Sequence, residues 1–214
     1  MRRFDWRLIR IALAFGLLPG ALLVHYCPRH NSWPITNEHP QGDVIVAFGD
    51  SLTAGYKMAD ADSYPAQLAS LVGRDILNRG VSGDSTAEGL ASLDRDVLAE
   101  NPGIVLLSLG ANDMLRRQSI EATFANLRRI IDRIQARGAL VILIGVEGFP
   151  MVHGDYGERY RALARETGCV YVDDILDDVF GDPALMYDQL HPNAAGYAKI
   201  AQRLESEVGS YLKR

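Results

Sequence analysis

The residues that could carry out chemistry together are a serine, an aspartate and a histidine. Ser51 follows a short apolar segment that ends in Gly49, so its hydroxyl is expected at the end of a buried strand. Asp188 and His191 are three positions apart, so a turn would bring the carboxylate close to the ring. Such a carboxylate holds one ring nitrogen and leaves the other free to take a serine proton. Taken alone, Ser51 could simply cap a helix, and the aspartate and histidine could form a surface turn.

Two further short stretches offer hydrogen-bond donors. Gly83 lies in the stretch Val81-Ser82-Gly83-Asp84 and could present an unhindered backbone N–H to a ligand oxygen. Asn112 follows Gly110-Ala111, and its side-chain amide could donate to an oxyanion. In isolation a turn glycine and a capping asparagine are the simpler interpretations. The chemical interpretation depends on all four stretches occurring together and in this order.

The elements that must position these residues alternate between strand and helix from residue 44 onward. Apolar runs predict strands at 44–48, 75–78, 104–109, 140–144 and 170–172, and helical periodicity predicts helices at 64–72, 85–99, 120–136, 156–166 and 194–212. Continuous apolar strands that alternate with helices predict an α/β fold with a parallel sheet covered on both faces. Ligands of such sheets bind at the carboxyl ends of the strands, where the polar stretches after the first three strands are expected.

Together, the four stretches resemble the motif blocks of the SGNH, or GDSL, hydrolases. The matching residues are Gly49-Asp50-Ser51-Leu52, Gly83, Gly110-x-Asn112-Asp113 and Asp188-x-x-His191-Pro192. The resemblance covers about residues 44–208 and implies a flavodoxin-like three-layer α/β/α fold with a five-stranded parallel sheet. It also implies that Ser51 is the nucleophile, His191 the base and Asp188 the residue that orients the base. The backbone N–H groups of Ser51 and Gly83 and the side chain of Asn112 would form the oxyanion hole.

The run from Gly49 to Tyr56 resembles the bacterial secreted thioesterase/lysophospholipase and arylesterase branch of that family. The resemblance implies a serine ester hydrolase that cleaves aryl or acyl esters, acyl thioesters or lysophospholipids, without metal or cofactor. In relatives the loop after the fourth strand, often Arg-x-Pro-x-Asn-Tyr-Gly, lines the acyl pocket. Here that loop differs but keeps Tyr156-Gly157, and the residues expected to bind substrate are Phe149, Pro150, Met151 and Tyr156.

Charge and cysteine content argue against nucleic-acid binding and against a structural zinc site. Residues 1–42 contain five arginines and two acidic residues, out of 22 basic and 27 acidic residues in the chain, so the remainder has a net charge of −8. An acidic domain without a basic stripe is a poor nucleic-acid binder. Cys27 and Cys169 have no CxxC spacing, which argues against a structural zinc site.

The N-terminal residues have the layout of an export signal. Four arginines precede the uncharged run from Ile11 to Val24, but no Ala-x-Ala cleavage site follows. Residues 1–27 are therefore predicted to be a signal peptide or an uncleaved membrane anchor, residues 28–42 a linker and residues 43–214 the hydrolase domain. An N-terminal amphipathic or core helix is the alternative. The basic flank predicts an outward-facing domain, periplasmic or secreted, either free or anchored in the inner membrane and so in contact with it.

Two rival functions remain open at this level. A carbohydrate O-deacetylase on the same scaffold would meet acetylated sugars outside the cell. A non-catalytic flavodoxin-like receiver or binding module would use Asp50 as a phosphoacceptor, but it gives no role to Asn112 or to the Asp188-x-x-His191 stretch.

Overall fold

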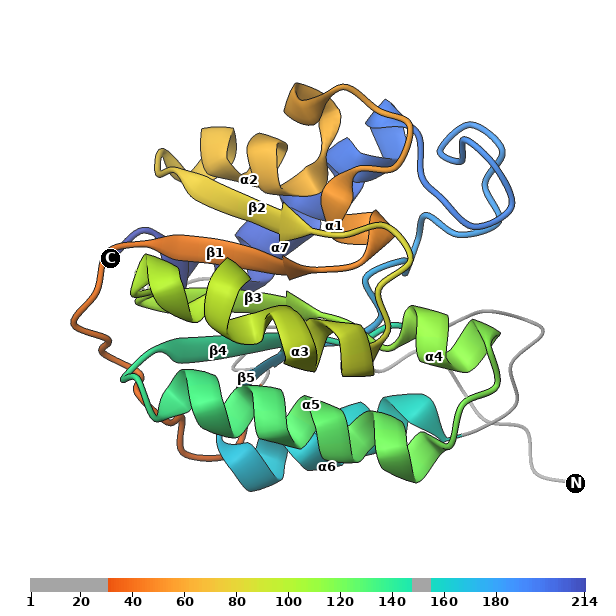
Figure 1. The fold of residues 1–214 in the computed structure, drawn as a ribbon. Coiled ribbons are helices and arrows are strands. Elements are labelled where there is room, and N and C mark those ends of the chain that lie inside the picture. The colour runs from red at the N-terminus through yellow and green to blue at the C-terminus, as the bar shows by residue number, and fades with distance from the viewer. Residues whose placement is uncertain (1–30, 148–154) are drawn as a thin grey trace, which may run out of the picture.

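The structure is a computed structural model that describes residues 31–147 and 155–214. Its centre is a five-stranded parallel sheet with the strand order β2-β1-β3-β4-β5 (Figure 1). The strands are β1 (Ile45–Gly49), β2 (Ile76–Gly80), β3 (Ile104–Ser108), β4 (Leu140–Ile144) and β5 (Val170–Val172). The predicted α/β class, three-layer arrangement and five-stranded parallel sheet are confirmed.

Helices cover both faces of this sheet. The helices are α1 (Ser51–Ala54), α2 (Tyr64–Val72), α3 (Thr86–Asp96), α4 (Ala111–Leu115), α5 (Ile120–Gln135), α6 (Tyr156–Thr167) and α7 (Ala194–Leu212), with short 3-10 turns at Asp60–Asp62 and Leu98–Glu100. Helix α2 packs against α7 on one face, and α5 lies between α3 and α6 on the other (Figure 1). Right-handed crossovers produce this division because the chain first moves from β1 to β2 and then reverses toward β3, β4 and β5.

The core forms where the sheet is covered on both sides. Every residue of β1, β3 and β4 is buried, whereas β2, at the edge, is only half-buried along its length. The edge position explains why β2 can carry the polar residues Asn78 and Arg79, and why it runs two residues beyond the strand predicted at 75–78. Burial of the apolar side chains supplies the main driving force for this arrangement.

The predicted elements agree with the structure except at the ends of some strands and helices and in very short helices. The helix predicted at 85–99 ends at Asp96 and is followed by a 3-10 turn at Leu98–Glu100. Its N-terminus has a capping box, in which Ser85 N donates to Glu88 Oε2 at 2.7 Å. Helices α1 and α4 were not predicted, because four or five residues are too few to show a helical period.

Residues 31–42, assigned to a linker, contain no helix or strand but hydrogen-bond to the domain. Trp33 Nε1 donates to Cys169 O at 2.9 Å, and Thr36 N donates to Gly168 O at 2.8 Å. The predicted signal or anchor at 1–27 lies outside the described residues, and the domain boundary stays a prediction. Among the helices that the structure describes, none has the length and apolar character needed to cross a membrane.

Candidate active site

The carboxyl edge of the sheet is where the chain turns sharply from β1 into α1. A Cβ atom at Gly49 would collide with Thr53 Oγ1 and Ser108 O, so only glycine allows the helix to start directly against the strand. Asp50 caps α1 by accepting a hydrogen bond from Leu52 N at 3.0 Å. This turn places Ser51 in the first position of α1, at the end of the sheet.

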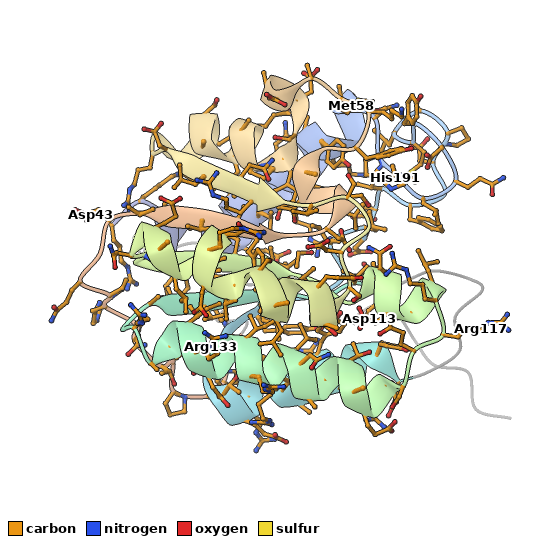
Figure 2. The ribbon with its side chains drawn as sticks, viewed as in Figure 1. Asp43, Met58, Asp113, Arg117, Arg133 and His191 are labelled. Carbon is orange, nitrogen blue, oxygen red and sulfur yellow. The ribbon has the colours of Figure 1, made fainter. Side chains whose placement is uncertain are left out.

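Ser51 and His191 meet across this edge although 140 positions separate them. Ser51 Oγ lies 3.0 Å from His191 Nε2, and His191 Nδ1 lies 3.0 Å from both carboxylate oxygens of Asp188. An Nδ1–H that donates to Asp188 leaves Nε2 as an acceptor for the serine proton. Figure 2 shows His191 at this rim with Met58, while Asp43 lies at the opposite end of the strands.

A tight turn between β5 and α7 fixes the imidazole. Asp188 Oδ1 accepts hydrogen bonds from Leu190 N and His191 N, both at 2.8 Å, and the Tyr56 ring stacks on His191 with 4.2 Å between centroids. Partial desolvation raises the pKa of Asp188, but these backbone N–H donors and the imidazole outweigh it, so the pKa lies below its ordinary value. The carboxylate beside the imidazole is therefore ionised at neutral pH.

The predicted donor residues lie on the other side of Ser51. Gly83 sits in a turn with a φ of +92°, a conformation that glycine adopts without strain. Asn112 is the second residue of α4, and its Nδ2 donates to Asp84 O at 3.0 Å and approaches Asp50 Oδ2 at 3.4 Å. Asp113, next in the chain, is buried and accepts from Thr86 N at 2.8 Å, which ties α4 to the start of α3.

These groups share one cleft with a volume of about 320 Å³. It is lined by Ser51, Leu52, Tyr56, Ser82, Gly83, Ala111, Asn112, Leu115, Leu190 and His191. The structure thus brings Ser51, Gly83, Asn112 and His191 to one cavity, with Asp188 behind the imidazole.

Of the four residues predicted to bind substrate, only Tyr156 lies in the described part of the chain, and it is not among the residues that line this cleft. Phe149, Pro150 and Met151 lie outside the described residues. Tyr156, at the start of α6, is nine-tenths buried, and its ring centroid lies 6.1 Å from that of Phe124. The apolar residues Tyr56, Leu115 and Leu190 line the cleft, and no sequence motif marks them.

The environment of Asp50 also could not be predicted from the sequence. Its side chain is buried, and desolvation, reinforced by the negative charges of Asp113 and Asp84, raises its pKa to about 7 despite the hydrogen bond from Leu52 N. The sequence shows that Asp50 is next to Ser51. It does not show that the Asp50 side chain is buried, because burial depends on the tertiary structure. In the part of the chain that the structure describes, no three His, Cys, Asp or Glu side chains are grouped so that they could hold a metal ion.

Comparison with known protein families decides what kind of site this is. The sequence model of the GDSL-like Lipase/Acylhydrolase family matches residues 47–199, which include every described residue of the site. The chain belongs to this family. This GDSL-like acylhydrolase is accordingly a carboxylic ester hydrolase, as its motif residues predicted.

Individual relatives of the GDSL-like acylhydrolase are esterases and thioesterases. The chain is 32% identical to an arylesterase of Vibrio mimicus over 78% of its length and 89% of the relative. It is 29% identical to thioesterase 1/protease 1/lysophospholipase L1 of Escherichia coli K12, covering 78% of the chain and 83% of that protein. A crystal structure of TesA superposes with a TM-score of 0.73 at 27% identity, covering 79% of this chain and 99% of TesA.

Proposed function

We propose that this acylhydrolase cleaves carboxylic esters or thioesters through an acyl-serine intermediate formed on Ser51. The hydrogen-bonded chain from Ser51 Oγ through His191 to Asp188, at the floor of the cleft, is the observation that carries the proposal. In this mechanism Ser51 Oγ attacks the carbonyl carbon while its proton passes to His191 Nε2. The imidazolium then protonates the leaving alcohol or thiol, and the acyl group stays on Ser51.

Hydrolysis of the acyl-serine reverses the roles. A water molecule attacks the acyl carbon and gives a proton to His191 Nε2, which passes it to Ser51 Oγ as the carboxylic acid leaves. Asp188 stays ionised throughout, since its low pKa suits it to stabilise the imidazolium rather than to take a proton.

The proposed oxyanion hole comprises Ser51 N–H, Gly83 N–H and Asn112 Nδ2, and these three residues line the same cleft. An amide nitrogen has two hydrogens, and Asn112 directs one to Asp84 O at 3.0 Å. Its other polar neighbour, Asp50 Oδ2, is 3.4 Å away, a long contact. Asn112 Nδ2 donates its second hydrogen to Asp50 Oδ2 in this long bond. We propose that it exchanges this weak bond for one to the oxygen that gains charge as Ser51 attacks, since donors of this kind stabilise the transition state more than the substrate.

The proposed substrates are aryl and acyl esters, acyl thioesters and lysophospholipids. Two observations support this range: the apolar cleft lining of Tyr56, Leu115 and Leu190, and the names of the Vibrio and E. coli relatives. We further propose that the domain faces the periplasm or the outside of the cell and contacts the membrane through residues 1–27, because four arginines precede an apolar run there.

Fluorophosphonate labelling and an ester panel test the proposed function together. The wild-type chain should take up one label per active site and hydrolyse p-nitrophenyl esters, whereas Ser51→Ala should fold, take up no label and lose nearly all turnover. A receiver module would not be labelled, and Asp50 is in any case only 1% exposed and gives a phosphoryl donor little access. Turnover of acetate esters alone would favour the carbohydrate deacetylase, and wild-type-like turnover by Ser51→Ala would sink the mechanism.

A further inference from the structure

Asn112 in α4 and Arg116, the residue that caps the C-terminal end of α4, hold two consecutive carbonyl groups of the turn that contains Gly83. Arg116 Nη2 donates to Gly83 O at 2.7 Å, and Asn112 Nδ2 donates to Asp84 O at 3.0 Å. Arg116 also donates its backbone N–H to Asn112 O at 3.0 Å, as expected for residues four apart at the end of a helix. Arg116 therefore contacts both Gly83 and Asn112, the two residues beyond Ser51 that the mechanism uses as donors.

The turn at 81–84 has few other restraints near the glycine. Val81 N donates to Gly49 O at 2.9 Å, and Asp84 N donates to Val81 O at 3.1 Å, which fixes the two ends of the turn. Gly83 itself has no side chain and a φ of +92°. Apart from atoms of Ser82, Gly83 and Asp84, the only atom of the described residues within 4 Å of a Cβ built at Gly83 is Arg116 Nη2, at 3.7 Å. Since glycine is the most flexible residue, this peptide depends on an outside contact to keep one orientation.

We propose that Arg116 is a positioning residue that supports the oxyanion hole by fixing the carbonyl of Gly83, and with it the peptide plane between Gly83 and Asp84. This inference rests on the proposed function, because it assigns a task to Arg116 only if Gly83 N–H and Asn112 are the oxyanion donors. A hydrogen bond on Gly83 O fixes the peptide plane between Gly83 and Asp84. It thereby limits rotation about ψ of Gly83, the dihedral that starts at its N–H nitrogen. The N–H of Gly83 then stays directed into the cleft without reorganisation during the reaction.

The Arg116 side chain is exposed, so its effect on the oxyanion hole can be measured apart from any effect on folding stability. The side chains of Arg116 and its ion-pair partner Glu88 are 47% and 56% exposed, with 3.4 Å between Nη1 and Oε2. Exposed ion pairs of this kind contribute little to folding stability. Replacement of Arg116 should therefore leave the fold intact, so an effect on turnover can be assigned to the geometry of the site.

Arg117 provides a matched control. It is the next residue, it is also an exposed arginine, and Figure 2 shows it pointing away from His191 and from the body of the molecule. Removal of either guanidinium changes the net charge near the cleft by the same amount. Long-range electrostatic effects are therefore similar in Arg116→Met and Arg117→Met. A difference in kcat between the two variants then reports the loss of the contact between Arg116 and Gly83 O.

The experiment measures kcat and KM on a neutral p-nitrophenyl ester, with active sites counted by fluorophosphonate titration and Tm recorded on the same samples. Arg116→Met should lower kcat by roughly ten-fold with little change in KM or Tm, a smaller loss than deletion of an oxyanion donor itself. Arg116→Lys should recover part of kcat, because an ammonium group can give one N–H bond to the carbonyl. Arg117→Met should match the wild type.

Three outcomes would overturn this proposal. Equal kcat for Arg116→Met and Arg117→Met would show that the contact with Gly83 O has no catalytic effect. A rise in KM with unchanged kcat would show that Arg116 binds substrate instead. A lower Tm with unchanged kcat per titrated site would make its role structural. Failure of the proposed function has a different signature, since wild-type protein would then escape labelling or Ser51→Ala would keep its turnover.

Discussion

Two carboxylates flank the reacting pair, and they occupy opposite environments. Asp50 precedes Ser51 in the chain and is enclosed between the sheet and its helices, with a pKa raised to about 7 by burial. Asp188 lies in the open turn before His191, with a side chain that is 39% exposed and a pKa below its ordinary value. Both accept hydrogen bonds from backbone N–H groups two residues on, so the difference lies in solvent and neighbouring charges.

This difference shows which carboxylate can support an imidazolium. Asp188 keeps its charge at neutral pH because water, two backbone donors and the imidazole stabilise the ionised form. Asp50 is surrounded by Asp113 and Asp84 and lacks solvent, which makes its ionised form costly. Proximity in sequence to the nucleophile is therefore a poor guide to the residue that orients the base.

The largest expected effect in this comparison follows from Asp188→Asn. An asparagine can still accept the N–H bonds of Leu190 and His191, but its amide nitrogen cannot accept from His191 Nδ1 and cannot stabilise a charged ring. We expect kcat to fall by roughly 10³–10⁴ at neutral pH with little change in Tm. Asp182→Asn, in the same loop, is the matched control, since Asp182 caps a turn at Ala184 away from the imidazole. Equal kcat values for the two variants would show that Asp188 does not orient the base.

Asn112→Ala should have the next largest effect. This side chain is the neutral donor between Asp50 and the cleft, and its removal should lower kcat by roughly 10²–10³ with little change in KM. Asn126→Ala removes an amide that contacts Thr86 Oγ1 at 3.2 Å, and it serves as a control for loss of a partly buried amide. A lower Tm with normal kcat per active site would instead make Asn112 a structural cap.

We expect Asp50 to affect the pH dependence of folding stability rather than proton transfer in catalysis. The pKa of Asp50 is about 7 in the folded protein against an ordinary value of 3.8, so the folded state binds this proton more tightly than the unfolded chain. The stabilisation that results is complete below about pH 4 and is lost as pH rises toward 7. Asp50→Asn keeps an acceptor for Leu52 N and has no charge to gain.

The measurement for Asp50 is Tm at pH 5 and at pH 8 in both proteins. Asp174, whose pKa burial raises to about 6, contributes in the same direction in both and cancels in the comparison. The wild type should lose more Tm between these pH values than Asp50→Asn, by roughly 5 °C, because each unit of pKa shift corresponds to about 1.4 kcal/mol. Identical losses would mean that Asp50 is ionised in the fold without penalty.

The smallest expected effect is that of a chelator. Neither Asp50 nor Asp188 belongs to a cluster of three metal-ligating side chains among the described residues. Dialysis against EDTA should therefore leave kcat unchanged within error. A loss that a divalent metal restores would show that one of these carboxylates works through an ion.

Part of the fold and part of the site could be predicted from the sequence. Apolar strands in β1, β3 and β4 predicted the parallel sheet, because strands buried on both faces carry few polar residues. The rule that ligands lie at the carboxyl ends of strands then predicted that Ser51, Gly83 and Asn112 share one rim. The contact of Arg116 with Gly83 O and the cleft lining by Leu115 and Leu190 were beyond prediction, because they depend on the direction of side chains in helices and turns too short to show a period.

The sequence by itself determined the order of strands and helices and the residue types of the site, because hydrophobic periodicity and motif spacing are local properties. Family membership also follows from the residues alone, since the match at 47–199 compares sequence with sequence. Tertiary structure alone decided that Ser51 Oγ lies 3.0 Å from His191 Nε2 across 140 positions. It also decided that the pKa of Asp188 is lowered whereas that of Asp50 is raised. Both shifts depend on solvent access and neighbouring charges, which are set by segments far apart in the chain.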